Sequence, residues 1–439
     1  MLRHVRTSGL LRGMIDPDRI AYIGHRSVWG GTQVFGLGRK DRAQHVFVIG
    51  KSGTGKSTML RNLIVSDIEA GEGVGVIDPH GDLAEELLDM IPPWRSRDVV
   101  YFNPADLEYP VAMNLLRSGS RDEIPLVASA IVSAFKTIWR DSWGPRLEYI
   151  LYACIMALAE CQNATILGVQ RMLSDEIYRS WVLKQVTDPA VRAFWLVEFA
   201  GYDRRLVAEA TAPVQNKIGA LLLSPAIRRI VGQVRSSIDL RFVMDRRRIF
   251  IANLSKGKVG EDKANLLGSL LIAQFQQAAL SRANVPEPNR VNFSLFVDEY
   301  SNFVTDSFAS VLAEARKYHF HLVLSGQHLG QTADVIRDAV FGNVGNVISF
   351  RIGEADAPIL QREFDGVFPS SRFTELANHE ILVKRLEEGR YREPFHATTL
   401  PPQGRFYGRR DKLIRQSRQR YATPRALVEN RIRRWMAPD

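Results

Sequence analysis

Residues 50–58 constrain the fold of this chain more than any other segment, because they read Gly-Lys-Ser-Gly-Thr-Gly-Lys-Ser-Thr. The G-x-x-x-x-G-K-S pattern binds phosphates when a strand precedes it and a helix follows it. The apolar run Val46–Ile49 predicts the strand. The helix is indicated by apolar residues at helical spacing: Met59, Leu60, Leu63 and Ile64. The segment therefore predicts a strand-loop-helix unit of an α/β sheet.

The residue types of this loop suit a nucleoside triphosphate. Glycines let the backbone N–H groups turn towards phosphate oxygens, and the start of the following helix adds to their attraction. Lys56 is expected to neutralise the β- and γ-phosphates, and the Ser57 hydroxyl to bind Mg²⁺. We therefore predict ATP and Mg²⁺ as ligands, with a nucleotide site formed by Gly50, Ser52, Gly53, Thr54, Gly55, Lys56, Ser57 and Thr58.

Short runs of consecutive apolar residues predict the other strands. Such runs indicate burial on both faces, as in a parallel sheet covered by helices. Residues 103–248 contain no comparable run, and apolar residues there recur at helical spacing, which favours an inserted all-helical domain. The strand runs are His45–Ile49, Val74–Ile77, Val99–Phe102, Ile249–Ala252, Leu295–Val297, His321–Leu324 and Val347–Phe350.

The chain divides into four predicted parts. Residues 1–45 form a basic segment with short strands, 46–119 together with 241–400 form an α/β core, 120–240 form the helical insertion, and 401–439 form an arginine-rich tail with a short helix. A turn at Glu388-Gly389 predicts a hairpin at the edge of the sheet.

Two carboxylates follow the apolar run at 293–297 and are candidates for hydrolysis. Asp298 is expected to orient Mg²⁺, and Glu299 to accept a proton from the attacking water. Gln327 lies at the tip of the neighbouring predicted strand and is expected to contact the γ-phosphate or that water. Arg316 has two interpretations, a charge that complements a helix C-terminus or an arginine offered to the ATP of a neighbouring subunit.

These motifs resemble those of the HerA/FtsK branch of P-loop ATPases, in particular the conjugative coupling proteins and the cytoplasmic ATPases of type IV secretion systems. The resemblance implies a RecA-like core with a mostly parallel sheet, in a ring-forming ATPase, usually a homohexamer, that moves DNA. Carried over by position, Gln327 is the sensor and Arg316 the arginine acting in trans. The motifs are GKSGTGKST (50–58), IDPHGD (77–82), WGPR (143–146), FVDEY (296–300), EARKY (314–318) and SGQ (325–327).

The chain departs from coupling proteins in that no apolar segment long enough to span a bilayer precedes the phosphate loop. We therefore expect a soluble cytoplasmic protein, recruited to the inner membrane, if at all, by partners. The expected partners are DNA of either strandedness and a secretion channel, a relaxase complex or a nuclease. Two other functions stay open: a secretion ATPase acting on protein substrates, and an ATPase scaffold that recruits a nuclease in defence or repair.

The net charge of +10 is carried by the ends of the chain. Residues 401–439 contain eleven Lys or Arg against three Asp or Glu, whereas residues 46–400 are slightly acidic. This pattern predicts that removal of the tail weakens DNA binding more than ATP hydrolysis. Three further features have two interpretations each. Asp78 and His80 lie near the nucleotide or form a turn, and Lys256 and Lys258 contact DNA or form a flexible solvated loop. Arg351 lies near an intersubunit site or is a surface charge.

Overall fold

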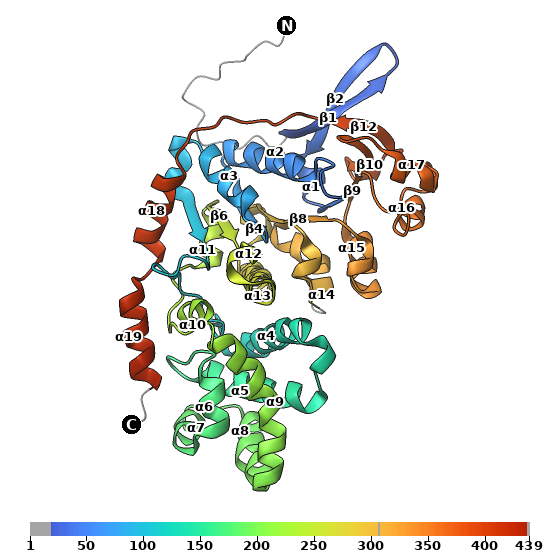
Figure 1. Cartoon of the computed structure of the whole chain (residues 1–439). Coiled ribbons are helices and arrows are strands. Elements are labelled where there is room, and N and C mark those ends of the chain that lie inside the picture. Colours follow the sequence, from blue (N-terminus) through green and yellow to red (C-terminus); the bar gives the residue numbers. More distant parts are fainter. Residues whose placement is uncertain (1–18, 306–307, 437–439) are drawn as a thin grey trace.

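A computed structural model of the chain describes residues 19–305 and 308–436. Its centre is a twelve-stranded sheet in the order β2-β1-β12-β10-β9-β3-β8-β7-β4-β6-β5, with β11 paired to β10 (Figure 1). The strands from β9 to β5 are parallel, which confirms the predicted α/β fold with a mostly parallel sheet. The strands are β1 (Ile20–Val28), β2 (Gly31–Gly38), β3 (Val46–Ile49), β4 (Gly73–Asp78), β5 (Val99–Phe102), β6 (Ile249–Asn253), β7 (Phe293–Val297), β8 (Phe320–Gly326), β9 (Asn346–Ser349), β10 (Glu380–Glu387), β11 (Arg390–Tyr391) and β12 (Phe395–Thr399).

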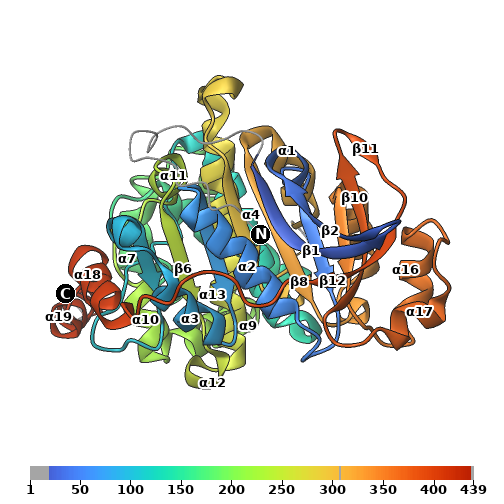
Figure 2. The ribbon, with the colours of Figure 1, turned by 90° about the horizontal axis from the view of Figure 1, so that it is seen from above.

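Helices cover both faces of the parallel strands, which explains why these strands are apolar throughout. Val46 and Val48 point to one core and Phe47 and Ile49 to the other, as the two-residue period of a strand requires. The first face carries α2 (Lys56–Glu69) and α3 (Asp82–Met90), which lie in front of the sheet in Figure 2. The second face carries α13 (Glu261–Leu280), α14 (Phe308–Ala315) and α15 (Asp334–Asn343), below the sheet in Figure 1. Shorter helices at the margins are α1 (Arg39–Arg42), α11 (Leu240–Asp245), α12 (Lys256–Val259), α16 (Ala357–Glu363) and α17 (Ser370–Glu375).

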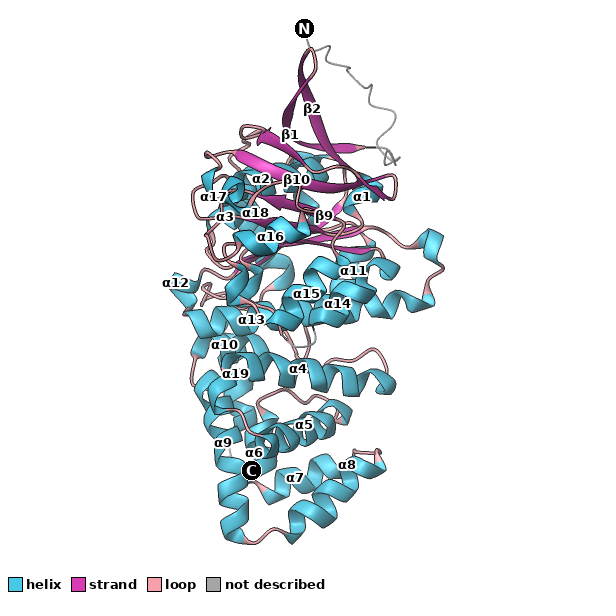
Figure 3. Cartoon of the chain, turned by 90° about the vertical axis from the view of Figure 1, so that its right-hand side faces the viewer, coloured by secondary structure: helices cyan, strands magenta, loops and turns pink. Residues whose placement is uncertain are grey.

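The chain between β5 and β6 forms a separate layer of helices below the sheet (Figure 3). Its helix α4 packs on α13, so the insertion shares the hydrophobic core of the second face. The inserted helical part of the predicted fold is thus present, while the boundaries at 120 and 240 stay a prediction. The helices are α4 (Ile124–Ile138), α5 (Pro145–Glu160), α6 (Gly168–Ser174), α7 (Glu176–Leu183), α8 (Pro189–Ala193), α9 (Arg204–Leu222) and α10 (Pro225–Val231).

The hairpin predicted for the edge of the sheet lies inside it. The chain does turn at Glu388 and Gly389, both with positive φ, between β10 and β11. However, β10 pairs with β9 on one side and with β12 on the other, and β1 then pairs with β12. The prediction of an edge hairpin was therefore wrong, because the β1–β2 hairpin from the other end of the chain extends the sheet.

The C-terminal tail holds two helices, α18 (Arg410–Tyr421) and α19 (Arg425–Met436), where the sequence predicted one. The chain crosses over α2 and α3 to reach them (Figure 1). Leu413 and Val428 are completely buried against the body. Three tail arginines pair with acidic side chains of the body, namely Arg410 with Glu85 and Asp89, Arg418 with Asp106, and Arg425 with Glu108. The tail is therefore a packed part of the fold.

Two further features are the apolarity of the helices and the burial of the two cysteines. In the described part of the chain, no helix combines the length and apolarity needed to cross a bilayer. Cys154 and Cys161 are both free and buried, and burial raises the pKa of each thiol. In these surroundings the two thiols pack as ordinary hydrophobic side chains.

Candidate functional site

The carboxyl ends of β3, β7 and β8 meet at one edge of the sheet and bring the predicted residues together. The register pairs Ile49 with Gly326 and Val297 with Leu324, so the loops that follow these strands start at the same level. The phosphate loop follows β3, the Asp298-Glu299 pair follows β7, and Gln327 follows β8. Ligands of open α/β sheets bind at this edge.

The phosphate loop is held in a curled conformation by its own contacts. Gly53 and Gly55 have φ values of 76° and 117°, which side-chain-bearing residues rarely adopt. The Thr54 hydroxyl donates to the carbonyl of Lys51 at 2.8 Å, and the backbone N–H of Lys51 donates to Arg351 O at 2.8 Å. These contacts fix the curled shape of the loop.

Lys56 and Ser57, neighbours at the end of this loop, differ in burial, as their predicted tasks require. Lys56, at the start of α2, is buried, and its ammonium donates to the carbonyls of Gly50 and Lys51. Burial lowers the pKa of Lys56, and the carboxylates of Glu299 and Asp298 partly oppose this. Ser52 and Ser57 are exposed, so the Ser57 hydroxyl is accessible at the helix start.

Asp298 and Glu299 occupy different environments at the end of β7. Asp298 Oδ1 accepts bonds from the Ser325 hydroxyl and, at 3.1 Å, from the backbone N–H of Glu299. Glu299 is buried and has a left-handed φ of 49°, which is uncommon for a non-glycine residue and recurs at functional sites. Its Oε1 lies 3.3 Å from the backbone N–H of Gln327 and 3.4 Å from the Ser301 hydroxyl. These contacts hold the carboxylate beside Gln327.

Arg316 lies at the opposite edge of the sheet. It begins the short helix η9 (Arg316–Tyr318), which precedes β8, and it is exposed. Strand β8 is seven residues long, so at about 3.3 Å per residue it separates Arg316 from the tip at Gln327 by roughly 20 Å. That distance exceeds the reach of an arginine side chain, and Arg316 cannot contact the phosphate loop of its own chain.

The structure also places the ambiguous residues. Asp78 is fully buried and accepts the backbone N–H groups of His80 and Ala84, so it caps α3. Lys258 lies in the short helix α12 and pairs with Glu85 at 3.6 Å, whereas a flexible loop was expected there. The Arg351 guanidinium donates to the carbonyl of Leu376 and to Asn378 Oδ1. Arg351 therefore lies next to the phosphate loop of its own chain.

Sequence reasoning missed two neighbours of the loop. Ser325, seen only as part of the SGQ motif, bonds Asp298. His379 lies more than three hundred positions after the loop, yet its backbone N–H donates to Thr54 O at 2.9 Å. A Cβ on Gly55 would come within 2.9 Å of His379 Nδ1. No local pattern could indicate the contact of His379, because it depends on the pairing of β10 and β12.

Two comparisons of the amino-acid sequence find similar proteins. Residues 35–184 match the family model of the type IV secretion-system coupling protein DNA-binding domain. The type 4 coupling protein DotL of Legionella pneumophila is 21% identical over 352 residues, covering 66% of this chain and 44% of DotL. The chain thus spans less than half the length of this relative.

Solved structures share the fold. The plasmid coupling protein TrwB in complex with ADP and Mg²⁺ has a TM-score of 0.62 at 14% identity, over 90% of this chain and 98% of that one. TrwB with the ATP analogue ADPNP gives 0.63 at 16% identity, over 84% and 88%. VirB4 of Thermoanaerobacter pseudethanolicus gives 0.56 at 14% identity, over 90% and 99%. The chain is therefore similar to type IV coupling proteins in sequence and in fold, as its motifs predicted.

Proposed function

We propose that the chain is an ATPase of the coupling-protein kind. It assembles into a ring, which we infer to be a homohexamer. It hydrolyses ATP between the subunits of this ring and uses the energy to move DNA. The observation that carries the proposal is the distribution of the site over two edges of one sheet. Lys56, Glu299 and Gln327 converge at the carboxyl edge, whereas Arg316 is exposed at the amino edge. A second copy with its amino edge against the first copy's nucleotide would complete the site.

The contacts of Glu299 suit a base for hydrolysis. Its carboxylate is fixed near the Gln327 N–H and takes the proton of a water that attacks the γ-phosphorus. The new P–O bond forms as the bond to the β–γ bridging oxygen breaks, and ADP leaves. Lys56 offsets the charge of the β- and γ-phosphates during this step.

The donor set fits Mg²⁺, which prefers oxygen ligands and keeps several waters. The exposed Ser57 hydroxyl and the Asp298 carboxylate supply those oxygens. Bound Mg²⁺ would neutralise charge on the phosphates. The complex of TrwB with ADP and Mg²⁺ supports ATP and Mg²⁺ as the ligands here.

DNA is the proposed polymer because the family model matched by residues 35–184 describes a DNA-binding domain. Phosphate contacts should dominate, so DNA affinity should fall steeply with salt. Three basic residues of the tail, Arg410, Arg418 and Arg425, pair within the chain. Other basic residues of the tail, such as Lys412, Arg415 and Arg433, are exposed and are candidates for phosphate contacts. Within the slightly acidic body, DNA would need a local basic lining.

ATPase assays of the full chain, with and without single- and double-stranded DNA, test the proposal. Lys56→Ala should abolish turnover, and Glu299→Gln should bind ATP without cleaving it, while the exposed control Glu287→Gln keeps wild-type activity. Turnover by Lys56→Ala would overturn the nucleotide site. Turnover that DNA does not change, together with stimulation by a protein substrate, would favour the secretion ATPase instead.

A further inference from the structure

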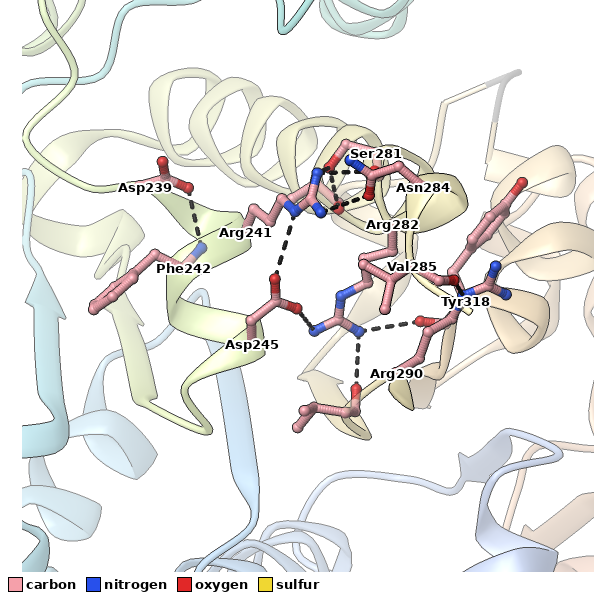
Figure 4. A network of polar contacts seen from close by, with 12 residues as sticks. Asp239, Arg241, Phe242, Asp245, Ser281, Arg282, Asn284, Val285, Arg290 and Tyr318 are labelled. Atoms are coloured by element: carbon pink, nitrogen blue, oxygen red, sulfur yellow. Dashed lines mark hydrogen bonds and ion pairs between the residues drawn. The ribbon is translucent and has the colours of Figure 1, made fainter. Parts of the chain in front are cut away.

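Helix η9, which carries Arg316, is held by two arginines from the segment before β7. Arg290 Nη1 donates to the carbonyl of Lys317 at 2.5 Å, and Arg282 Nη1 donates to the carbonyl of Tyr318 at 3.1 Å (Figure 4). The Arg290 guanidinium also lies over the Tyr318 ring, 5.2 Å from its centroid. Both residues that follow Arg316 are therefore fastened through their backbone.

Arg282 is an unusual residue for its position because only 1% of it is exposed. A buried charge is costly unless it is paired and hydrogen-bonded. Arg282 forms an ion pair with the Asp245 carboxylate at 2.8 Å, and its Nη1 donates to the carbonyl of Val291 at 2.9 Å as well as to that of Tyr318. Through these contacts, Arg282 connects the segments that precede β7 and β8 with helix α11.

Helix α11 in turn is tied to the same segment. Arg241 donates to Ser281 O at 2.9 Å and to Asn284 Oδ1 at 2.7 Å, and Asp239 caps the helix through the Phe242 N–H at 3.1 Å (Figure 4). Helix α11 is the first element of the chain after the helical insertion. The contacts of Arg241, Arg282 and Arg290 therefore connect η9, through α11, to the end of that insertion.

We propose that Arg282 and Arg290 are positioning residues for Arg316, which hold η9 so that the Arg316 guanidinium is presented to the nucleotide of the adjacent subunit. This inference rests on the proposed shared site. Arg316 is exposed, so its own packing cannot fix its direction, and the order of η9 must come from its backbone. A displacement of about 1 Å can cost on the order of a hundredfold in rate.

The test combines single and double variants of the full chain. Arg290→Ala should lower kcat by about 10- to 100-fold with little change in the KM for ATP or in the melting temperature, and Arg282→Lys should lower it less. The exposed control Arg246→Ala, just after α11 and without a bond to η9, should keep wild-type turnover. In the Arg316→Ala background, Arg290→Ala should have no further effect.

Mixed rings separate positioning from a merely structural role. Arg290→Ala subunits retain Glu299, and Glu299→Gln subunits retain Arg316 on an intact η9, so mixtures should exceed the activity of both parents. Equal kcat for Arg290→Ala and wild type, or a mixture with no gain, would overturn the positioning role. If Arg316→Ala itself turns over ATP normally, the shared site of the proposed function fails instead, a result that this series distinguishes.

Discussion

His45 links the strand of the phosphate loop to the helix that precedes Arg316, and its titration gives a quantitative prediction. It is completely buried just before β3. Its Nδ1 accepts the backbone N–H of Leu322 at 3.0 Å, so the neutral ring donates from Nε2 to the carbonyl of Leu312 at 3.1 Å. Burial, with a smaller contribution from Arg316, lowers the pKa of His45 to about 4 from its ordinary 6.5.

The sign of the effect follows from proton binding. Between pH 6.5 and 4 the unfolded chain binds a proton at His45 that the folded chain does not, so acid favours unfolding. Stability from the neutral ring is complete above pH 6.5 and is lost as the pH falls. At about 1.4 kcal/mol per pKa unit, the loss is about 1.4 kcal/mol at pH 5.5 and roughly 2–3 kcal/mol at pH 4.5. This is a large part of a typical stability of about 5–15 kcal/mol.

Urea unfolding of wild type and His45→Gln at pH 7.5, 5.5 and 4.5 measures this loss. The variant should be less stable at pH 7.5, because it disturbs two buried hydrogen bonds. Its deficit should shrink by roughly 2–3 kcal/mol at pH 4.5. The comparison cancels groups that His45 does not influence. His321 cancels only in part, because its pKa is lowered first by burial and then by His45 itself, besides His319 and Arg42. The matched control is the exposed His80→Gln, whose difference from wild type should stay constant. A pH-independent deficit for His45→Gln would refute the reasoning.

Two other substitutions test the phosphate loop and the tail. Gly55→Ala should abolish nucleotide binding in a fluorescent-ATP assay, since φ is 117° and the new Cβ would lie 2.9 Å from His379 Nδ1, whereas Gly257→Ala, with open space around it, should bind normally; normal binding by Gly55→Ala would contradict the assigned loop. Leu413→Ala should cost about 2–5 kcal/mol of stability in thermal unfolding, because the side chain is fully buried, while the exposed control Lys412→Ala should not. An unchanged melting temperature for Leu413→Ala would mean that the tail is separable, as its charge alone suggested.

Local patterns in the sequence were sufficient for the parallel strands from β9 to β5, for the phosphate loop and for the position of the Asp298-Glu299 pair. A buried parallel strand needs only a short apolar run, and the loop after it needs glycines where φ is positive, as at Gly53 and Gly55. Parallel strands also end at one edge, so the sequence alone places Gln327 near Glu299. These features depend on residues within a few positions of one another.

Tertiary structure decided what depends on contacts between distant segments. Pairing of β1 with β12 moved the predicted hairpin into the sheet, and Leu413 and Arg410 made the basic tail a packed element. The same holds for Arg316, whose motif indicates an arginine but not the edge on which it lies. The charge and the hydrophobic periodicity of a segment follow from its own residues. The residues that bury or neutralise its side chains depend on how distant segments of the chain pack together.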